Sequence, residues 1–312
     1  MNPRAATLAI LVAIVWGLCF VLIQAALPSP APLLLAALRA LLGGGVLGAW
    51  IALRRWRPRT RRTDDGRVAA NPRSSGLPSI PVLIALALTN AVLALGAMYL
   101  AAGRAEAAVA SILAGGQPLV LAGAGWALFG ERASVRTLTG LGVAMAGVVL
   151  VATTSSGATS AAGIALALLA AAAPAAGTVL MRRLAPTVDV VLTTCAQFLV
   201  GGTILAGASA VLEPWGALHW SLATVVSLLI LGVAGTGLAY VGWFWLVDRV
   251  SFVRLGSALF LVPVTGVVAA IVTGARPAPL ELVGIVVVLI GIAIASLAST
   301  SESAGRPNAQ TA

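Results

Sequence analysis

The chain alternates between long apolar runs and short polar connectors, and the runs have the length of membrane-spanning helices. A helix that crosses the hydrocarbon core of a bilayer needs about 20 mostly apolar residues. Ten such runs account for nearly all of the 312 residues. The pattern therefore predicts an all-α integral membrane protein with ten transmembrane helices. These are predicted over residues 5–26, 32–53, 79–101, 106–129, 134–153, 161–180, 188–211, 221–247, 252–273 and 279–298.

The last five predicted helices repeat the first five. Residues 130–147 align without a gap on residues 274–291, with six identical positions out of eighteen. Two further matches lie upstream in the same order, Pro118 with Pro263 and Arg39 with Gln197. Such self-similarity indicates an internal duplication. Because each copy holds an odd number of helices, the two copies must be inverted relative to one another.

We therefore predict two inverted five-helix repeats, residues 1–153 and 161–298. Inverted repeats are typical of secondary transporters, whose substrate site lies near the midplane between the copies. Residues 54–78 form an Arg-rich cytoplasmic loop, and residues 299–312 form a disordered cytoplasmic tail. The loop could bind anionic lipid or a regulator, but the pattern favours a solvated topological signal.

Composition and charge support this class and set an orientation. The chain is 60% hydrophobic and 9% charged, with a mean hydropathy of +1.05. All 19 basic residues are Arg, and sixteen of them fall in the tails and in alternate loops on one side. The positive-inside rule therefore predicts that both termini are cytoplasmic. We expect a multi-pass protein of the bacterial cytoplasmic (inner) membrane, in contact with membrane lipids and with no nucleic-acid partner.

Several motifs in this order resemble the EamA family of the drug/metabolite transporter superfamily. They are Trp16-Gly17 with Phe20, Arg39, Tyr99 with Ala102, Pro118, residues 129–132, Gly163, residues 235–245 and residues 259–274 with Pro263. The resemblance implies a fold of two EamA-like repeats. It also implies a protein that exports or exchanges small metabolites, amino acids or drugs. Two departures are Gly274-Ala275, where the family often has Gly-Glu, and Ala173-Pro174, where it often has an aromatic residue.

Polar groups inside a bilayer are costly, so they are candidates for function. Arg39 lies seven residues into the second predicted helix, roughly 10 Å deep at 1.5 Å per residue. Its guanidinium could hold a substrate carboxylate or phosphate. Alternatively, it could extend along its aliphatic stem towards the interface. Both readings remain open.

Two helical stripes of larger side chains could line a weakly polar aromatic pocket for apolar or cationic ligands. One holds Trp16 and Phe20, and the other holds Thr236, Tyr240 and Trp243. The same stripes could instead face lipid. The further substrate-binding candidates are Asn90, Ser111, Gln117 and Gln197. Asn90 is preferred over Tyr99, which points to the opposite face of its helix, and Gln117 could equally bond a neighbouring helix.

Pro118 and Pro263 occupy matched positions, and paired breaks in corresponding helices point to a transporter's site. We predict that both act as hinges, because a proline inside a helix removes one backbone hydrogen bond. Glycines such as Gly147 and Gly291 form close-packing seams, either within the fold or in a possible homodimer. Cys19 and Cys195 are interpreted as core residues.

The sequence predicts a secondary transporter that moves a small-molecule substrate by alternating access, through export or exchange. No catalytic or metal-ligand constellation is visible, so neither an enzyme nor a cofactor is expected. No Asp or Glu lies deep in a predicted helix, which favours uniport or exchange over obligatory proton coupling. The alternative is a membrane-embedded receptor or regulatory subunit that binds a ligand without transport.

Overall fold

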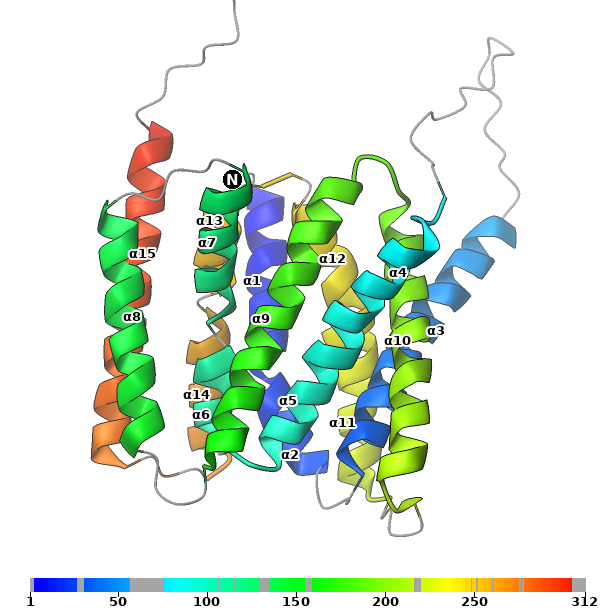
Figure 1. Cartoon of the computed structure of the whole chain (residues 1–312), viewed down its shortest axis with the longest axis horizontal. Coiled ribbons are helices and arrows are strands. Elements are labelled where there is room, and N and C mark those ends of the chain that lie inside the picture. Colours follow the sequence, from blue (N-terminus) through cyan, green and yellow to red (C-terminus); the bar gives the residue numbers. More distant parts are fainter. Residues whose placement is uncertain are drawn as a thin grey trace, which may run out of the picture.

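The computed structural model is helical throughout the part of the chain that it describes (Figure 1). The described residues are 3–26, 31–56, 76–105, 107–114, 116–129, 135–154, 159–215, 220–247, 249–250, 252–259, 261–274, 276 and 278–304. Lipid offers no hydrogen-bond partner to a backbone, so helices that satisfy their own amides are the expected form for such apolar runs.

The first predicted repeat contains eight α-helices and one π-helix. They are α1 (Pro3–Gly17), α2 (Cys19–Ala26), α3 (Pro32–Trp56), α4 (Ile80–Ala87), η1 (Leu88–Leu93), α5 (Ala94–Ala102), α6 (Ala107–Ala114), α7 (Gln117–Phe129) and α8 (Val135–Thr154). The second contains α9 (Ala161–Leu184), α10 (Val190–Leu212), α11 (Leu222–Gly232), η3 (Val233–Leu238), α12 (Ala239–Val247), α13 (Phe252–Leu259), α14 (Leu261–Val272) and α15 (Pro279–Ala304).

Within the described ranges, six helical segments are long and apolar enough to cross a membrane. They are Pro3–Ala26, Pro32–Arg54, Ile80–Ala102, Ala161–Leu184, Val190–Leu212 and Leu222–Val247. Shorter apolar helices cover Leu138–Gly147, Leu261–Val272 and Leu282–Gly291. The chain is thus a multi-pass, all-α membrane protein, and the count of ten crossings stays a prediction.

One boundary differs from the sequence prediction. The final helix, α15, continues to Ala304 and so includes the start of the segment predicted as a disordered tail from residue 299. The physical reason is local, because the helix-breaking residues Gly305 and Pro307 come only after Ala304. Residues 305–312 of that tail and residues 57–75 of the Arg-rich loop lie outside the described residues.

Helices at corresponding places in the two halves pack against one another. The pairs are α3 with α10, α8 with α15, α6 with α14, and α7 with α13. Two cross-contacts match in the same way, since α1 packs on α12 while α9 packs on α5. Figure 1 shows α8 and α15 side by side at one end of the bundle.

The α8–α15 pair depends on close approach at two glycines. A Cβ atom on Gly147 would lie 2.6 Å from the Val288 backbone nitrogen, and one on Gly291 would collide with the Ala144 backbone. Only glycine allows two helix backbones this near. The seam that the sequence left open between fold and homodimer is therefore used within the chain.

The two π-helical segments also correspond. Segment η1 interrupts the helix formed by α4 and α5, and η3 interrupts the helix formed by α11 and α12 at the matching point. A π-helical turn releases some carbonyls from their usual donors, and such turns are frequent at functional sites. Each segment packs on helices of the other half, since η1 contacts α9 and α10 while η3 contacts α1 and α3.

Candidate functional site

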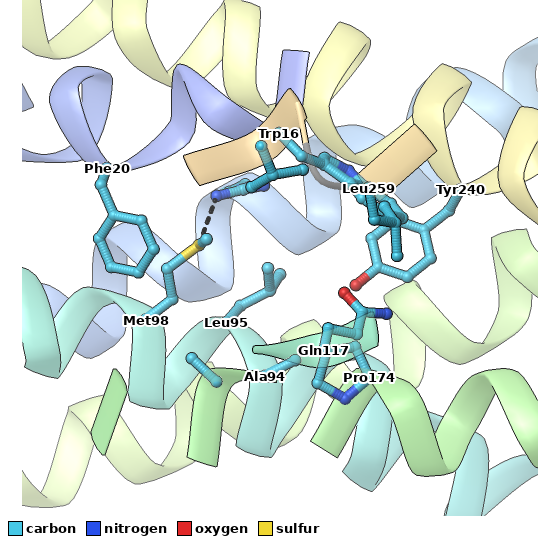
Figure 2. Close-up of a pocket in the computed structure, with 12 residues that line it drawn as sticks. Trp16, Phe20, Ala94, Leu95, Met98, Gln117, Pro174, Tyr240 and Leu259 are labelled. Carbon is cyan, nitrogen blue, oxygen red and sulfur yellow. Dashed lines mark hydrogen bonds between the residues drawn. The ribbon is translucent and has the colours of Figure 1, made fainter. Parts of the chain in front are cut away.

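A small cavity lies inside the bundle between helices of both halves (Figure 2). Its volume is about 50 Å³, enough for a few water molecules. Five predicted site residues contribute to the wall, together with apolar residues from four helices. The lining residues are Trp16, Phe20, Arg39, Ala94, Leu95, Met98, Gln117, Ala170, Pro174, Tyr240, Leu259 and Val262.

Arg39 is the charged member of this wall. It projects from α3 and is only 1% exposed. Its Nε donates to Thr236 Oγ1 at 2.9 Å, while Nη2 and Nη1 contact Cys19 Sγ at 3.4 Å and Met98 Sδ at 3.5 Å. The Met98 contact is the dashed line in Figure 2. Because sulfur is a weak acceptor, the guanidinium retains much of its donor capacity.

The described carboxylates bind elsewhere. Asp189 and Glu213 are the acidic residues whose side chains the structure describes. The Asp189 carboxylate accepts from the amides of Val191 and Leu192 at the start of α10. Glu213 accepts from the amides of Leu33 and Leu34 at the start of α3. Both therefore cap helices, and neither neutralises Arg39.

Aromatic rings form a second part of the wall. The Trp16 ring lies 5.2 Å from that of Tyr240 and 5.3 Å from that of Trp243, within the range of favourable tilted contacts. In η3 the Ala239 amide reaches back to Ala234, which releases the Gly235 carbonyl from its α-helical donor. Trp16 Nε1 donates to that carbonyl at 3.0 Å, and the π-helix thereby holds the ring in place.

Gln117 and the turn of α9 before Pro174 add polar groups to the side of the cavity opposite the Trp16 ring. Gln117 Nε2 is buried and has no hydrogen-bond partner among the described residues. Figure 2 shows the Gln117 amide pointing towards the Tyr240 hydroxyl. Pro174 lies inside α9 and has no N–H to donate to Ala170, four residues earlier. Ala170 and Pro174 both line the cavity. The hydrogen bond that α9 lacks is therefore at the cavity wall. Pro174 belongs to the departure from the family pattern noted above.

Four other predicted residues are buried but do not line the cavity. Thr236 holds Arg39, and Trp243 Nε1 donates to Thr178 Oγ1 at 3.0 Å. Asn90 and Gln197 pair with each other, since Asn90 Nδ2 donates to Gln197 Oε1 at 3.0 Å. In the part of the chain that the structure describes, Asn90 Oδ1 and Gln197 Nε2 have no hydrogen-bond partner.

Pro118 and Pro263 lie shortly after residues 115 and 260, which are outside the described residues. Pro118 is the second residue of α7, after a turn in which the Gly116 amide donates to Leu113. Pro263 is the third residue of α14. The mid-helix positions and hinge roles of the two prolines stay predictions. The side chains of Ser111 and Pro118 lie outside the described residues.

Sequence reasoning missed the sulfur contacts of Arg39. Cys19 was expected to be a core residue, and it is fully buried, yet its Sγ also accepts from the guanidinium. Met98 carries no distinguishing signal, because an apolar residue beside a cavity has the same character as one facing lipid. Among the described residues, no group of three or more His, Cys, Asp or Glu could hold a metal ion.

A larger hollow of about 450 Å³ lies between the α9–α10 connection and α12. Its wall includes Trp245 and Arg249, which are both exposed. It lacks the buried polar side chains that converge on the central cavity. We therefore assign the candidate site to the smaller cavity.

The fold and this central polar cavity are those of a membrane transport protein, and comparisons identify the family. Residues 3–153 and 161–297 match the EamA-like transporter family. The chain belongs to this family, within the drug/metabolite transporter superfamily.

Two named bacterial proteins are similar to this chain over nearly their whole length. The uncharacterized transporter YvbV of Bacillus subtilis (strain 168) is 27% identical, with 97% of this chain and 95% of that protein covered. A "probable amino-acid metabolite efflux pump" of Salmonella typhimurium (strain LT2) is 28% identical, with coverage of 94% and 95%. A protein of known crystal structure matches with a TM-score of 0.70 at 19% identity, covering 97% of this chain and 99% of that one, which shows the fold.

Proposed function

We propose that this protein is a secondary transporter that moves a small metabolite, amino acid or drug-like compound across the cytoplasmic membrane by alternating access. The observation that carries the proposal is the cavity between the two halves, where Arg39 meets the rings of Trp16 and Tyr240 inside the bundle. The direction is export or exchange, and the relative named as an efflux pump supports export.

The proposed architecture is two inverted five-helix repeats, residues 1–153 and 161–298, with ten crossings in total. The matched helix pairs and the matched π-helices η1 and η3 support it. The N-terminus and the ends of α3, α9 and α15 lie at one face in Figure 1. Arginines concentrate at these segments, which supports cytoplasmic termini.

The size of the cavity supports a change of conformation. Sites for drug-sized ligands are usually about 300–1,000 Å³, whereas this cavity measures about 50 Å³. A substrate larger than a few waters therefore needs the helices to separate. Rocking of α6–α7 and α13–α14 near Pro118 and Pro263 would open the cavity to each side in turn, through uniport or exchange.

The test is flux through purified protein in liposomes, measured with a panel of labelled amino acids and other small metabolites. We expect saturable uptake of at least one compound, accelerated by the same compound inside the vesicle. Trp16→Ala should abolish this flux because it removes the ring that packs on Tyr240. Trp126→Ala is the matched control, since Trp126 is 63% exposed on α7.

The alternative is a membrane-embedded receptor that binds without transport. The same liposomes distinguish the two. Binding of a compound that never crosses the membrane would support the receptor, whereas flux excludes it. Membership of a transporter family favours the transporter.

A further inference from the structure

We infer that the cavity selects a small organic monoanion, whose carboxylate binds Arg39 and whose apolar body packs against Trp16 and Tyr240. This inference rests on the proposed function and names the substrate class of the same site. It depends on three observations, which are the unneutralised guanidinium, the polarity of the remaining wall, and the chemistry of the matching position in the other half.

The guanidinium is built to receive an anion. Arg39 is 1% exposed, and burying a charge without a counter-ion is unfavourable. Among the described residues, Thr236 Oγ1 accepts from Nε, and the two terminal nitrogens face the sulfurs of Cys19 and Met98. A carboxylate can accept two parallel hydrogen bonds from a guanidinium. It would replace these weak acceptors and neutralise the charge.

The rest of the wall suits an apolar body with at most one further acceptor. Apart from Arg39, the described lining residues are aromatic or aliphatic except for Gln117 and the Tyr240 hydroxyl. The unpartnered Gln117 Nε2 can donate to one polar atom at the far end of the ligand. The lining residues offer no carboxylate to a cation.

The other half limits the ligand to one charge. Gln197 occupies the position that corresponds to Arg39, and it bonds Asn90 rather than facing the cavity. A dianion would need a second cation, and the described lining residues include none besides Arg39. The two halves therefore provide one anion contact, and a ligand binds in one orientation.

Thr236 is a positioning residue in this scheme. Its Oγ1 fixes Nε from η3, which leaves the two terminal nitrogens to meet the carboxylate. Thr236→Val should weaken binding of the anion, while Thr236→Ser should restore it because serine keeps the oxygen.

The test uses the full-length protein in detergent and matched sets of ligands that share one body. Phenylacetate, phenylacetamide and phenethylamine form one set, and 4-methylpentanoate with its amide and amine forms another. Calorimetry or thermal shift measures binding. In at least one set we expect the carboxylate to bind ten-fold or more tightly than the neutral amide, with the amine weakest. Equal affinities within the sets, or the absence of carboxylate binding in all of them, overturns the inference.

Variants add a second readout. Arg39→Gln should remove the preference, so that carboxylate and amide bind alike. Arg104→Gln makes the same chemical change at an exposed position and should keep it. The comparison of ligands on the wild-type protein tests the preference for a carboxylate even if Arg39→Gln does not fold. Selective binding of the carboxylate without flux in liposomes would contradict the proposed transport function but support the inference about the anion. Flux without a preference for the carboxylate would support transport and contradict the inference.

Discussion

Two buried polar centres occupy corresponding places in the two halves and differ in one respect. In the first, Arg39 lies beside Cys19 and bonds Thr236 of the opposite half. In the second, Gln197 bonds Asn90 of the opposite half, and Asn90 packs on Gly177. Gly177 follows Cys19 at the same separation as Gln197 follows Arg39. The frame is shared, and only the first centre is charged and lines the cavity.

The difference teaches where a charge can be placed inside this bundle. A buried guanidinium needs either a counter-ion or access to a space that can hold water or a ligand. Arg39 lines such a space. The Asn90–Gln197 pair lies away from the cavity and is neutral, so leaving one acceptor and one donor unmatched is less costly. Four mutational tests, each with its own comparison, address this difference.

The largest expected effect comes from placing a charge in the second centre. Gln197→Arg would bury a guanidinium where Gln197 is fully covered and no cavity receives it. We expect a loss of about 3–5 kcal/mol in the free energy of unfolding, measured by titration with a denaturing detergent. Gln197→Glu is a useful comparison because it also buries a charge but keeps the shape. Normal stability of both variants would contradict the distinction between the centres.

Removing the charge from the first centre comes next. Arg39→Gln makes the two centres alike, and we expect transport and binding of a carboxylate substrate to fall by roughly 100-fold. Stability should fall little, because an uncompensated charge has been removed. Flux in liposomes and thermal unfolding of the same preparation measure the two effects. Unchanged kinetics would show that Arg39 does not contact the substrate.

The third test uses two glycines that face these centres. A Cβ atom on Gly177 would collide with the Asn90 amide, whereas one on Gly235 would meet Arg39 Nη2 at an ordinary 3.5 Å. Gly177→Ala should therefore destabilise the protein by about 1–3 kcal/mol. Gly235→Ala is the matched control and should lose no more than about 0.5 kcal/mol. Equal stability of the two variants would indicate that Asn90 can move freely.

The smallest expected effect is at the oxygen that holds the guanidinium. Thr236→Val removes the acceptor at 2.9 Å from Arg39 Nε and keeps the shape of the side chain. Loss of one buried hydrogen bond to a charged group corresponds to roughly ten-fold weaker binding of a carboxylate substrate. Equilibrium binding measures it, and Thr236→Ser should recover most of the loss. Binding of the carboxylate by Thr236→Ser that is as weak as its binding by Thr236→Val would argue against the role of the oxygen.

Much of the helical architecture could be predicted because its signals are local. An apolar run of about 20 residues has to form a helix in lipid, and the repeat around Arg39 and Gln197 is visible by alignment. The site was predicted only in part. Five of the candidates line one cavity, namely Trp16, Phe20, Arg39, Gln117 and Tyr240. The sequence pointed to them because polar and large aromatic side chains stand out within an apolar run.

The remaining candidates show the limits of spacing. Thr236, Tyr240 and Trp243 were expected on one stripe, but the π-helical segment η3 contains Thr236 and changes the register of the following turn. Asn90 was preferred as a cavity residue over Tyr99, and neither lines the cavity. A polar side chain in a helix can face a cavity or bond a neighbouring helix, and the local sequence is the same in both cases.

The amino-acid sequence by itself determined the helical class, the duplication and the arginine-rich side, because these depend on chain-local hydrophobicity, on internal similarity and on charge counts. Only the tertiary structure decided that Arg39 meets Thr236, Cys19 and Met98, and that its counterpart is covered by Asn90. Those partners come from different helices, and their contacts depend on how helices cross and where a π-turn rotates a side chain.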